Sequence, residues 1–193
     1  ICLAHRIKGL TILGFENNEQ MIEISKENIE LNQYQKIINT LKVDIEGDLK
    51  DIQNSKGQTF DHVYANPPYF NSESSITPKN DNKKAANIGN AKTLDLWIKK
   101  SLTFSKSGGQ ITFINHINNL PTLLHLFSKK MGAIEVTPIF PKRNSLASRV
   151  IISGVRDSKK AITFNDGLIL NNSKGVSTKR VDGILRKGCA LKG

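Results

Sequence analysis

The chain has 193 residues, 38% of them hydrophobic, which is enough for one globular domain with a substantial core. No run approaches the roughly 18 consecutive apolar residues of a membrane-spanning helix, and no secretory-signal pattern opens the sequence, so we expect a cytoplasmic protein. Cys2 and Cys189 lie far apart, with neither a CxxC spacing nor a Cys/His cluster, which predicts free thiols and no metal site.

The positive charge is unevenly distributed along the chain. Half of the 28 lysines and arginines, but only 4 of the 17 acidic residues, follow Ser128, so the net charge of +11 is concentrated in the last third. A concentrated basic surface attracts phosphate through counterion release, which favours nucleic acid as a partner. A solvated basic face that only aids solubility is the alternative, and charge alone does not separate the two.

The first third of the chain shows a strand pattern, a helix pattern and two further strand patterns. The strands are predicted at residues 10–15, 38–45 and 60–65. Glu16 closes the first strand, and Asn17 or Asn18 is expected to cap the helix that follows it. A loop carrying Asp48 follows the second strand, and the third strand ends at an Asn-Pro-Pro sequence.

The rest of the chain begins with a polar segment and then resumes the alternation. Residues 71–92 show no periodicity, which predicts a long loop of the kind that often binds substrate or acts as a lid. Helices are predicted at residues 93–104 and 121–130, and strands at residues 110–114, 134–139 and 149–155. The SKSGG sequence closes the first of these helices with glycines. A turn joins the last two strands and contains Pro141, Lys142, Arg143 and Asn144.

This alternation predicts an α/β fold with a mostly parallel sheet, and the short last turn predicts one antiparallel strand at its edge. Neither an internal repeat nor a linker is found, so residues 1–193 are predicted to form a single domain. Ligands of such sheets bind at the carboxyl ends of the parallel strands. Glu16, Asp48 and Asn66 each follow a predicted strand, and we therefore expect them to face one crevice.

Residues 64–70, YANPPYF, resemble the motif of class I S-adenosylmethionine-dependent methyltransferases that modify amino groups. With the segments WIKKSLTFSKSGGQITFI, PIFPKRNSLASRVII and GLILNNSKGVSTKRVDGILRKGCAL, nearly the whole chain is similar to the bacterial tRNA-Val (adenine-N6)-methyltransferase family. The resemblance implies a Rossmann-like fold, S-adenosylmethionine as cofactor, tRNA as partner and adenine N6-methylation as the reaction. NPPY alone is less specific, because adenine methyltransferases of DNA and RNA share it with the glutamine methyltransferases of release factors.

The chemistry of amino groups accounts for the NPPY residues. An exocyclic adenine amine is a poor nucleophile, because its lone pair is delocalised into the ring. A residue before a proline is held extended, so the Asn66 side-chain oxygen can accept one amine hydrogen, with the Pro67 carbonyl as a second acceptor. Neither Pro67 nor Pro68 has a competing N–H, and two acceptors favour a lone pair directed at the methyl group. Tyr69, aided by Phe70, would stack on the flipped base, a contact of about 1–3 kcal/mol.

The resemblance assigns Glu16, Asp48 and Asn66 to cofactor binding, with Glu16 on the donor's ribose hydroxyls and Asp48 near its adenine. An exposed helix-cap carboxylate is the alternative for Glu16, and Asp44 competes with Asp48 if the register slips. In such sheets the acidic residue follows a glycine-rich loop by about 20 residues. No GxGxG occurs in the chain, so we expect the first strand and this loop to precede Ile1, in a missing N-terminal fragment. Cofactor binding by this chain alone is then expected to be incomplete, which would leave it inactive.

The turn after the predicted strand at residues 134–139 carries the best candidates for RNA contact. Lys142, Arg143 and Arg149 are predicted to contact the RNA backbone, and a solvated surface is the alternative. Further basic residues that would extend this track are Lys179, Arg180, Arg186 and Lys187. Two other functions remain open: a protein glutamine methyltransferase, and a non-catalytic RNA-binding remnant or untranslated relic. For YANPPYF itself, the alternative is a rigid loop whose aromatics pack in the core.

Overall fold

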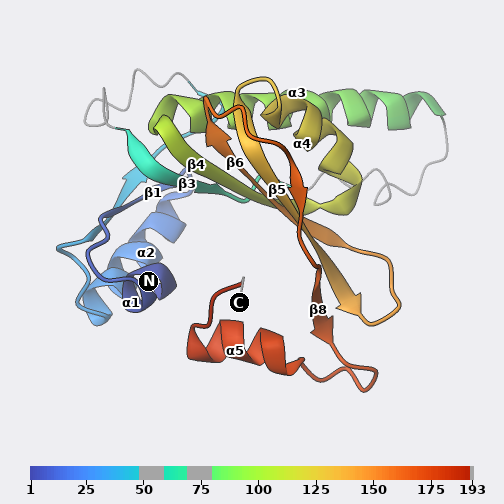
Figure 1. The fold of residues 1–193 in the computed structure, drawn as a ribbon. Coiled ribbons are helices and arrows are strands. Elements are labelled where there is room, and N and C mark those ends of the chain that lie inside the picture. Colours follow the sequence, from blue (N-terminus) through green and yellow to red (C-terminus); the bar gives the residue numbers. More distant parts are fainter. Residues whose placement is uncertain (48–58, 69–79, 192–193) are drawn as a thin grey trace. The chain divides into compact units, whose positions relative to one another are not determined.

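The computed structural model describes residues 1–47, 59–68 and 80–191, with the backbone alone for residues 80–90 (Figure 1). Its contacts divide the chain into two compact units, Ile1–Gly57 and Gln58–Gly193. Each unit is described by itself, and the prediction of one domain over the whole chain stays a prediction. No helix in the described ranges combines the length and the apolar composition that crossing a bilayer requires.

The first unit is a strand–helix–strand arrangement, as the sequence pattern predicts. Its elements are α1 (Cys2–Arg6), β1 (Ile12–Glu16), α2 (Glu19–Leu31) and β2 (Ile38–Lys42). The two strands are parallel, with Ile12 opposite Ile38 and Glu16 opposite Lys42. The side chain of Asn18 accepts a hydrogen bond from the backbone N–H of Met21, which makes Asn18 the N-cap of α2.

The second unit contains the remaining strands and helices. They are β3 (Phe60–Ala65), α3 (Asn80–Phe104), β4 (Ser105–His116), a 3-10 turn (Ile117–Asn119), α4 (Leu120–Phe127), β5 (Met131–Lys142), β6 (Arg149–Arg156), β7 (Thr163–Phe164), β8 (Leu168–Asn171) and α5 (Lys179–Lys187). The sheet has the order β3-β4-β6-β5-β7, and β8 also pairs with β5. β3 is parallel to β4, and β7 and β8 are parallel to β5.

The antiparallel strand lies inside the sheet and not at its edge, which corrects the prediction from sequence. β6 pairs antiparallel with β4 on one side and with β5 on the other. A short turn between β5 and β6 requires that they be antiparallel, but leaves open on which side of β5 the returning strand lies. The burial of Val150 and Ile152, both fully inaccessible to solvent, is what an interior strand requires.

Helices cover both faces of this sheet (Figure 1). α3 and α4 lie on one face, over a core that includes the buried Ile111, Phe113 and Phe127. The rings of Phe113 and Phe127 meet edge to face, with centroids 5.5 Å apart. α5 lies on the other face, where Val181 packs with Ile139 of β5.

The predicted and observed boundaries differ most at α3 and β4. α3 begins at Asn80, inside the segment predicted to be a loop, because residues 80–92 contain helix-forming residues without the apolar periodicity by which a helix is recognised. β4 begins at Ser105, directly after α3, so the SKSGG glycines lie within the strand and do not cap the helix. Phe60 pairs with Ser105 and His62 with Gln110, which leaves residues 106–109 as a bulge. Gly108 there has φ +75°, a conformation that favours glycine.

Replacing Phe113 by alanine tests the core between the sheet and the α3–α4 layer. Phe113 has no exposed surface, so Phe113→Ala should lower the free energy of unfolding by about 3–5 kcal/mol. Phe164, which is 65% exposed, provides the matched control, and Phe164→Ala should change the free energy of unfolding by less than about 0.5 kcal/mol. Urea unfolding followed by circular dichroism measures both values, and equal losses would contradict this description of the core.

Candidate active site

Glu16 ends β1 with its carboxylate oriented by the turn that follows. Its Oε1 accepts hydrogen bonds from the backbone N–H groups of Asn17, at 2.9 Å, and Asn18, at 3.0 Å. Its Oε2 accepts none from the residues that the structure describes, and the side chain is only half buried. One carboxylate oxygen is thus held in place while the other can accept hydrogen bonds from a ligand. The strand end and the helix N-cap together create this arrangement.

The end of β2 lies beside Glu16. The N–H of Val43 donates to the backbone oxygen of Glu16 at 2.9 Å, so Asp44 follows at the same edge of this two-stranded sheet. Asp44 is exposed, and its Oδ1 accepts from the N–H of Glu46 at 2.8 Å. Asp48, the residue preferred from the sequence, lies outside the described residues. Glu16 and Asp44 are therefore the two predicted acidic residues that the described part of this unit brings to one edge.

The Asn-Pro sequence at the end of β3 combines an exposed amide with a buried ring. Ala65 pairs with Phe113 of β4, and Asn66 follows it as an exposed residue. The ring of Pro67 is less than 2% exposed, so packing fixes the backbone directly after Asn66. Pro68 is exposed. Burial of Pro67, the residue after Asn66, thus supports the rigid Asn66 backbone that the X-Pro sequence predicts.

The predicted stacking residues Tyr69 and Phe70 lie outside the described residues, and their roles stay predictions. Glu16 and Asn66 belong to different units, so the prediction that they face one crevice also stays a prediction.

The three predicted RNA-contact residues lie at the same edge of the second sheet as Asn66. This edge is the one formed by the carboxyl ends of β3, β4 and β5. β5 runs parallel to β3 and β4, because β6 is antiparallel to both of its neighbours, and Lys142 ends β5 at that edge. Arg149 opens β6 opposite His116, the last residue of β4. Arg143 follows Lys142 in the exposed turn between β5 and β6. The strand directions therefore gather an amide and three cations along one edge.

One buried polar cluster at this edge was not found from the sequence. Asn115 of β4 is fully buried, and its Oδ1 accepts from the N–H of His116, at 2.8 Å, and from Nδ2 of Asn119, at 2.7 Å. Its own Nδ2 has no hydrogen-bond partner among the residues that the structure describes. The backbone donor of His116 requires the oxygen on that side, which establishes how the amide is oriented. An asparagine directly after the apolar QITFI run was the available signal.

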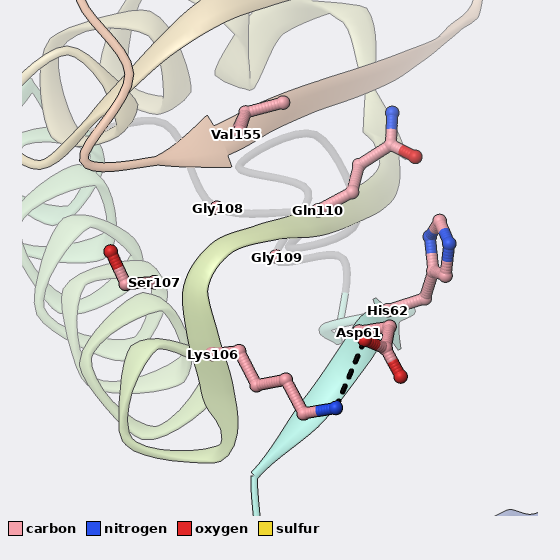
Figure 2. A pocket seen from close by; sticks show the side chains of 8 residues that line it. All are labelled: Asp61, His62, Lys106, Ser107, Gly108, Gly109, Gln110 and Val155. Carbon is pink, nitrogen blue, oxygen red and sulfur yellow. Dashed lines mark hydrogen bonds and ion pairs between the residues drawn. The ribbon is translucent and has the colours of Figure 1, made fainter.

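A hollow of about 380 Å³ lies at the opposite edge, where β3 and β4 begin. Figure 2 shows its lining, which includes His62, Gln110 and the glycines of the β4 bulge. Nζ of Lys106 lies 3.0 Å from Oδ1 of Asp61, and both side chains are exposed. Because ligands of parallel sheets bind at the carboxyl ends, this hollow is a poorer candidate than the edge at Asn66. The described residues contain no group of three or more His, Cys, Asp or Glu able to hold a metal ion.

A model of the Eco57I restriction-modification methylase family matches residues 3–122, more than half of the chain. The chain belongs to this family. The resemblance to amino-group methyltransferases, drawn from YANPPYF and later segments, is thereby supported at the level of a methylase family. Solved structures support the same fold.

The chain resembles a predicted O-methyltransferase from Agrobacterium tumefaciens, protein Atu636, with a TM-score of 0.73 at 21% identity, over 95% of the chain and 80% of that protein. It also resembles the delta-N METTL16 methyltransferase domain, with a TM-score of 0.58 at 20% identity, over 81% and 67%. The predicted fold class is therefore confirmed: the chain has the Rossmann-like α/β fold of class I methyltransferases.

Curated relatives are similar at lower identity. The chain is 26% identical over 114 residues to a tRNA1(Val) (adenine(37)-N6)-methyltransferase of Actinobacillus succinogenes, covering 59% of the chain and 47% of the relative. Haemophilus influenzae proteins of the same name are 24% identical: strain PittEE over 80% of the chain and 62% of the relative, strain PittGG over 93% and 73%. The chain thus spans about half to three-quarters of these relatives.

The Asp61–Lys106 ion pair leads to a prediction that can be tested by nuclear magnetic resonance. The hydrogen bond and charge of Lys106 lower the pKa of the Asp61 carboxyl below its ordinary value. The pair therefore stabilises the fold at pH values above the ordinary pKa of an aspartate carboxyl. This contribution is lost as the pH falls through the lowered pKa of Asp61 in the folded state. A carboxyl-carbon titration should show Lys106→Met raising the pKa of Asp61. Lys129→Met, at an exposed lysine between α4 and β5, should leave it unchanged, and equal shifts would contradict the pairing.

Proposed function

We propose that this chain forms part of an S-adenosylmethionine-dependent methyltransferase that modifies N6 of an adenine in tRNA. The observation that carries the proposal is Asn66, exposed at the carboxyl end of β3, followed by a buried proline, in a chain of a methylase family. The names of the curated relatives support tRNA and adenine N6 as substrate and position.

Asn66 and Pro67 would position the amine. The Oδ1 atom of Asn66 and the backbone oxygen of Pro67 each accept one N6 hydrogen, which turns the nitrogen lone pair out of the ring plane. The lone pair could then attack the donor's methyl carbon, whose bond to the sulfonium sulfur breaks to leave a neutral thioether, and one N6 proton is lost to solvent. Because burial of the Pro67 ring fixes the backbone next to both acceptors, little backbone rearrangement is needed when substrate binds.

S-adenosylmethionine supplies an electrophilic methyl group when bound. Glu16 fits such a donor, because one oxygen of its carboxylate is held by the turn and the other can accept from a ribose hydroxyl. Asp44, at the end of the neighbouring strand, or Asp48 would contact the donor's adenine. Tyr69 and Phe70 would stack on the substrate base.

Lys142, Arg143 and Arg149 would bind the RNA backbone beside the amine site. They lie at the same edge of the second sheet as Asn66, and phosphate contacts of this kind supply affinity that depends on salt. DNA is the second candidate substrate, favoured by the restriction-modification description of the family. A basic edge and an amine-binding Asn-Pro serve both nucleic acids, so an assay must separate them.

A transfer assay with radiolabelled S-adenosylmethionine separates the candidates. The full-length protein is incubated with tRNA, with duplex DNA of mixed sequence, and with a bacterial release factor. We expect label in tRNA, as N6-methyladenine after nuclease digestion. Label chiefly in DNA would favour the second candidate, label in the release factor would indicate a glutamine methyltransferase, and no label in any of them would contradict the proposal.

Replacing Asn66 tests the role of its side-chain oxygen. Asn66→Ala removes one of two aimed acceptors and should lower kcat about 10²- to 10³-fold, by analogy with the loss of one preorganised hydrogen-bonding group. Asn28→Ala is the matched control, because Asn28 is exposed on α2, where its side chain only donates to Ile24. Single-turnover transfer to tRNA measures both. Equal rates for the two variants would remove Asn66 from the site.

A further inference from the structure

Two turns leave the second sheet side by side at the edge that carries Asn66. The first turn, residues 143–148, joins β5 to β6, and the second turn, residues 172–176, follows β8. β8 is parallel to β5, with Lys142 opposite Asn171, and the Asn171 side-chain amide donates to the backbone oxygen of Pro141 at 3.3 Å. Figure 1 shows β5 and β8 ending close to one another. The two turns are thus held together before any ligand binds.

Side chains within each turn hold its backbone. Oδ1 of Asn172 accepts from the N–H groups of Lys174, at 2.9 Å, and Val176, at 3.1 Å. Gly175 has φ +77°, which closes the second turn. In the first turn, the hydroxyl of Ser145 donates to the backbone oxygen of Lys142 at 2.6 Å. Turns held in this way lose little conformational entropy when they bind a ligand.

The two turns and the residues next to them carry positive charge and no carboxylate. Residues 141–149 and 171–180 together contain six cations and no acidic side chain: Lys142, Arg143, Arg149, Lys174, Lys179 and Arg180. At the opposite edge, two of the cations pair with carboxylates, Lys106 with Asp61 and Arg156 with Asp157. An edge without carboxylates attracts a polyanion without repelling it.

Each turn also exposes an apolar side chain among its cations. Leu146 is 91% exposed in the first turn, and Val176 is 59% exposed in the second. Mixed apolar and cationic surface suits nucleic acid, whose riboses and base edges lie between the phosphates.

We propose that the second turn is a further contact for the RNA backbone, and that the two turns together clamp the RNA at the end of the sheet that carries Asn66. This inference rests on the proposed function for the identity of the ligand. Lys174 supplies the additional phosphate contact, and Asn172 holds the turn that presents it. The sequence predicts RNA contacts at and next to the first turn and at basic residues of α5, and the β5–β8 pairing adds the second turn between them.

The test is the salt dependence of tRNA binding by the full-length protein. Affinity for fluorescently labelled tRNA is measured by anisotropy from 50 to 200 mM NaCl. Loss of one phosphate contact in Lys174→Gln should reduce the slope of log K against log salt by about 0.7–0.9. Lys129→Gln is the control, because it removes the same charge from an exposed lysine at the opposite edge, and its slope should match that of the unchanged protein.

Each outcome decides the inference. An unchanged slope in Lys174→Gln overturns it, and so does an equal loss in Lys129→Gln, which would indicate a general charge effect. Tighter binding of duplex DNA than of tRNA at the same salt overturns the choice of RNA. Methyl transfer by the unchanged protein is measured separately: transfer without the slope change rejects the clamp alone, and the slope change without transfer rejects the proposed function alone.

Discussion

The insertion of β6 between β4 and β5 is the constraint on which the second unit depends. β6 is hydrogen-bonded on both sides and runs against both neighbours, so β4 and β5 are parallel although they never touch as a pair. Their carboxyl ends therefore meet at one edge, and the start of β6 returns Arg149 to that same edge. The candidate site is a consequence of these directions more than of any single contact.

Strands and amphipathic helices were recognisable from the sequence wherever one face of an element is buried. β3 lies at residues 60–65, as its apolar run predicted, and Asn18 caps α2 as its position suggested. The beginning of α3 was missed, because residues 80–92 lack the apolar spacing by which a helix is recognised. β7, β8 and α5 were missed because β7 and β8 are very short and α5 buries little more than Val181 and its neighbours. The side of β5 on which β6 lies depends on pairing between distant segments, which no local pattern contains.

For the candidate site, the chemical roles of single residues could be predicted from the sequence, but contacts between residues distant in sequence could not. An asparagine before two prolines could be interpreted from backbone sterics alone, and the burial of Pro67 adds the packing that keeps it rigid. The acidic residue at the end of β1 was also found from a local pattern, because a polar residue closes an apolar run. Asn115 and the pairing of β8 with β5 required the folded chain, because their significance lies in residues distant in sequence.

The Nδ2 atom of Asn115, which has no hydrogen-bond partner in the described part of the chain, lowers the stability of the sheet at this point. A buried donor without an acceptor costs about 1–3 kcal/mol, but replacing Asn115 by an apolar side chain would also remove the oxygen that accepts from the N–H of His116 and from Nδ2 of Asn119. The asparagine therefore makes two hydrogen bonds at the cost of one unpaired donor. Its presence at the carboxyl end of β4, close in the sheet to the strand that ends at Asn66, marks a region where the protein tolerates local instability. Attempts to stabilise this protein should therefore begin elsewhere in the fold.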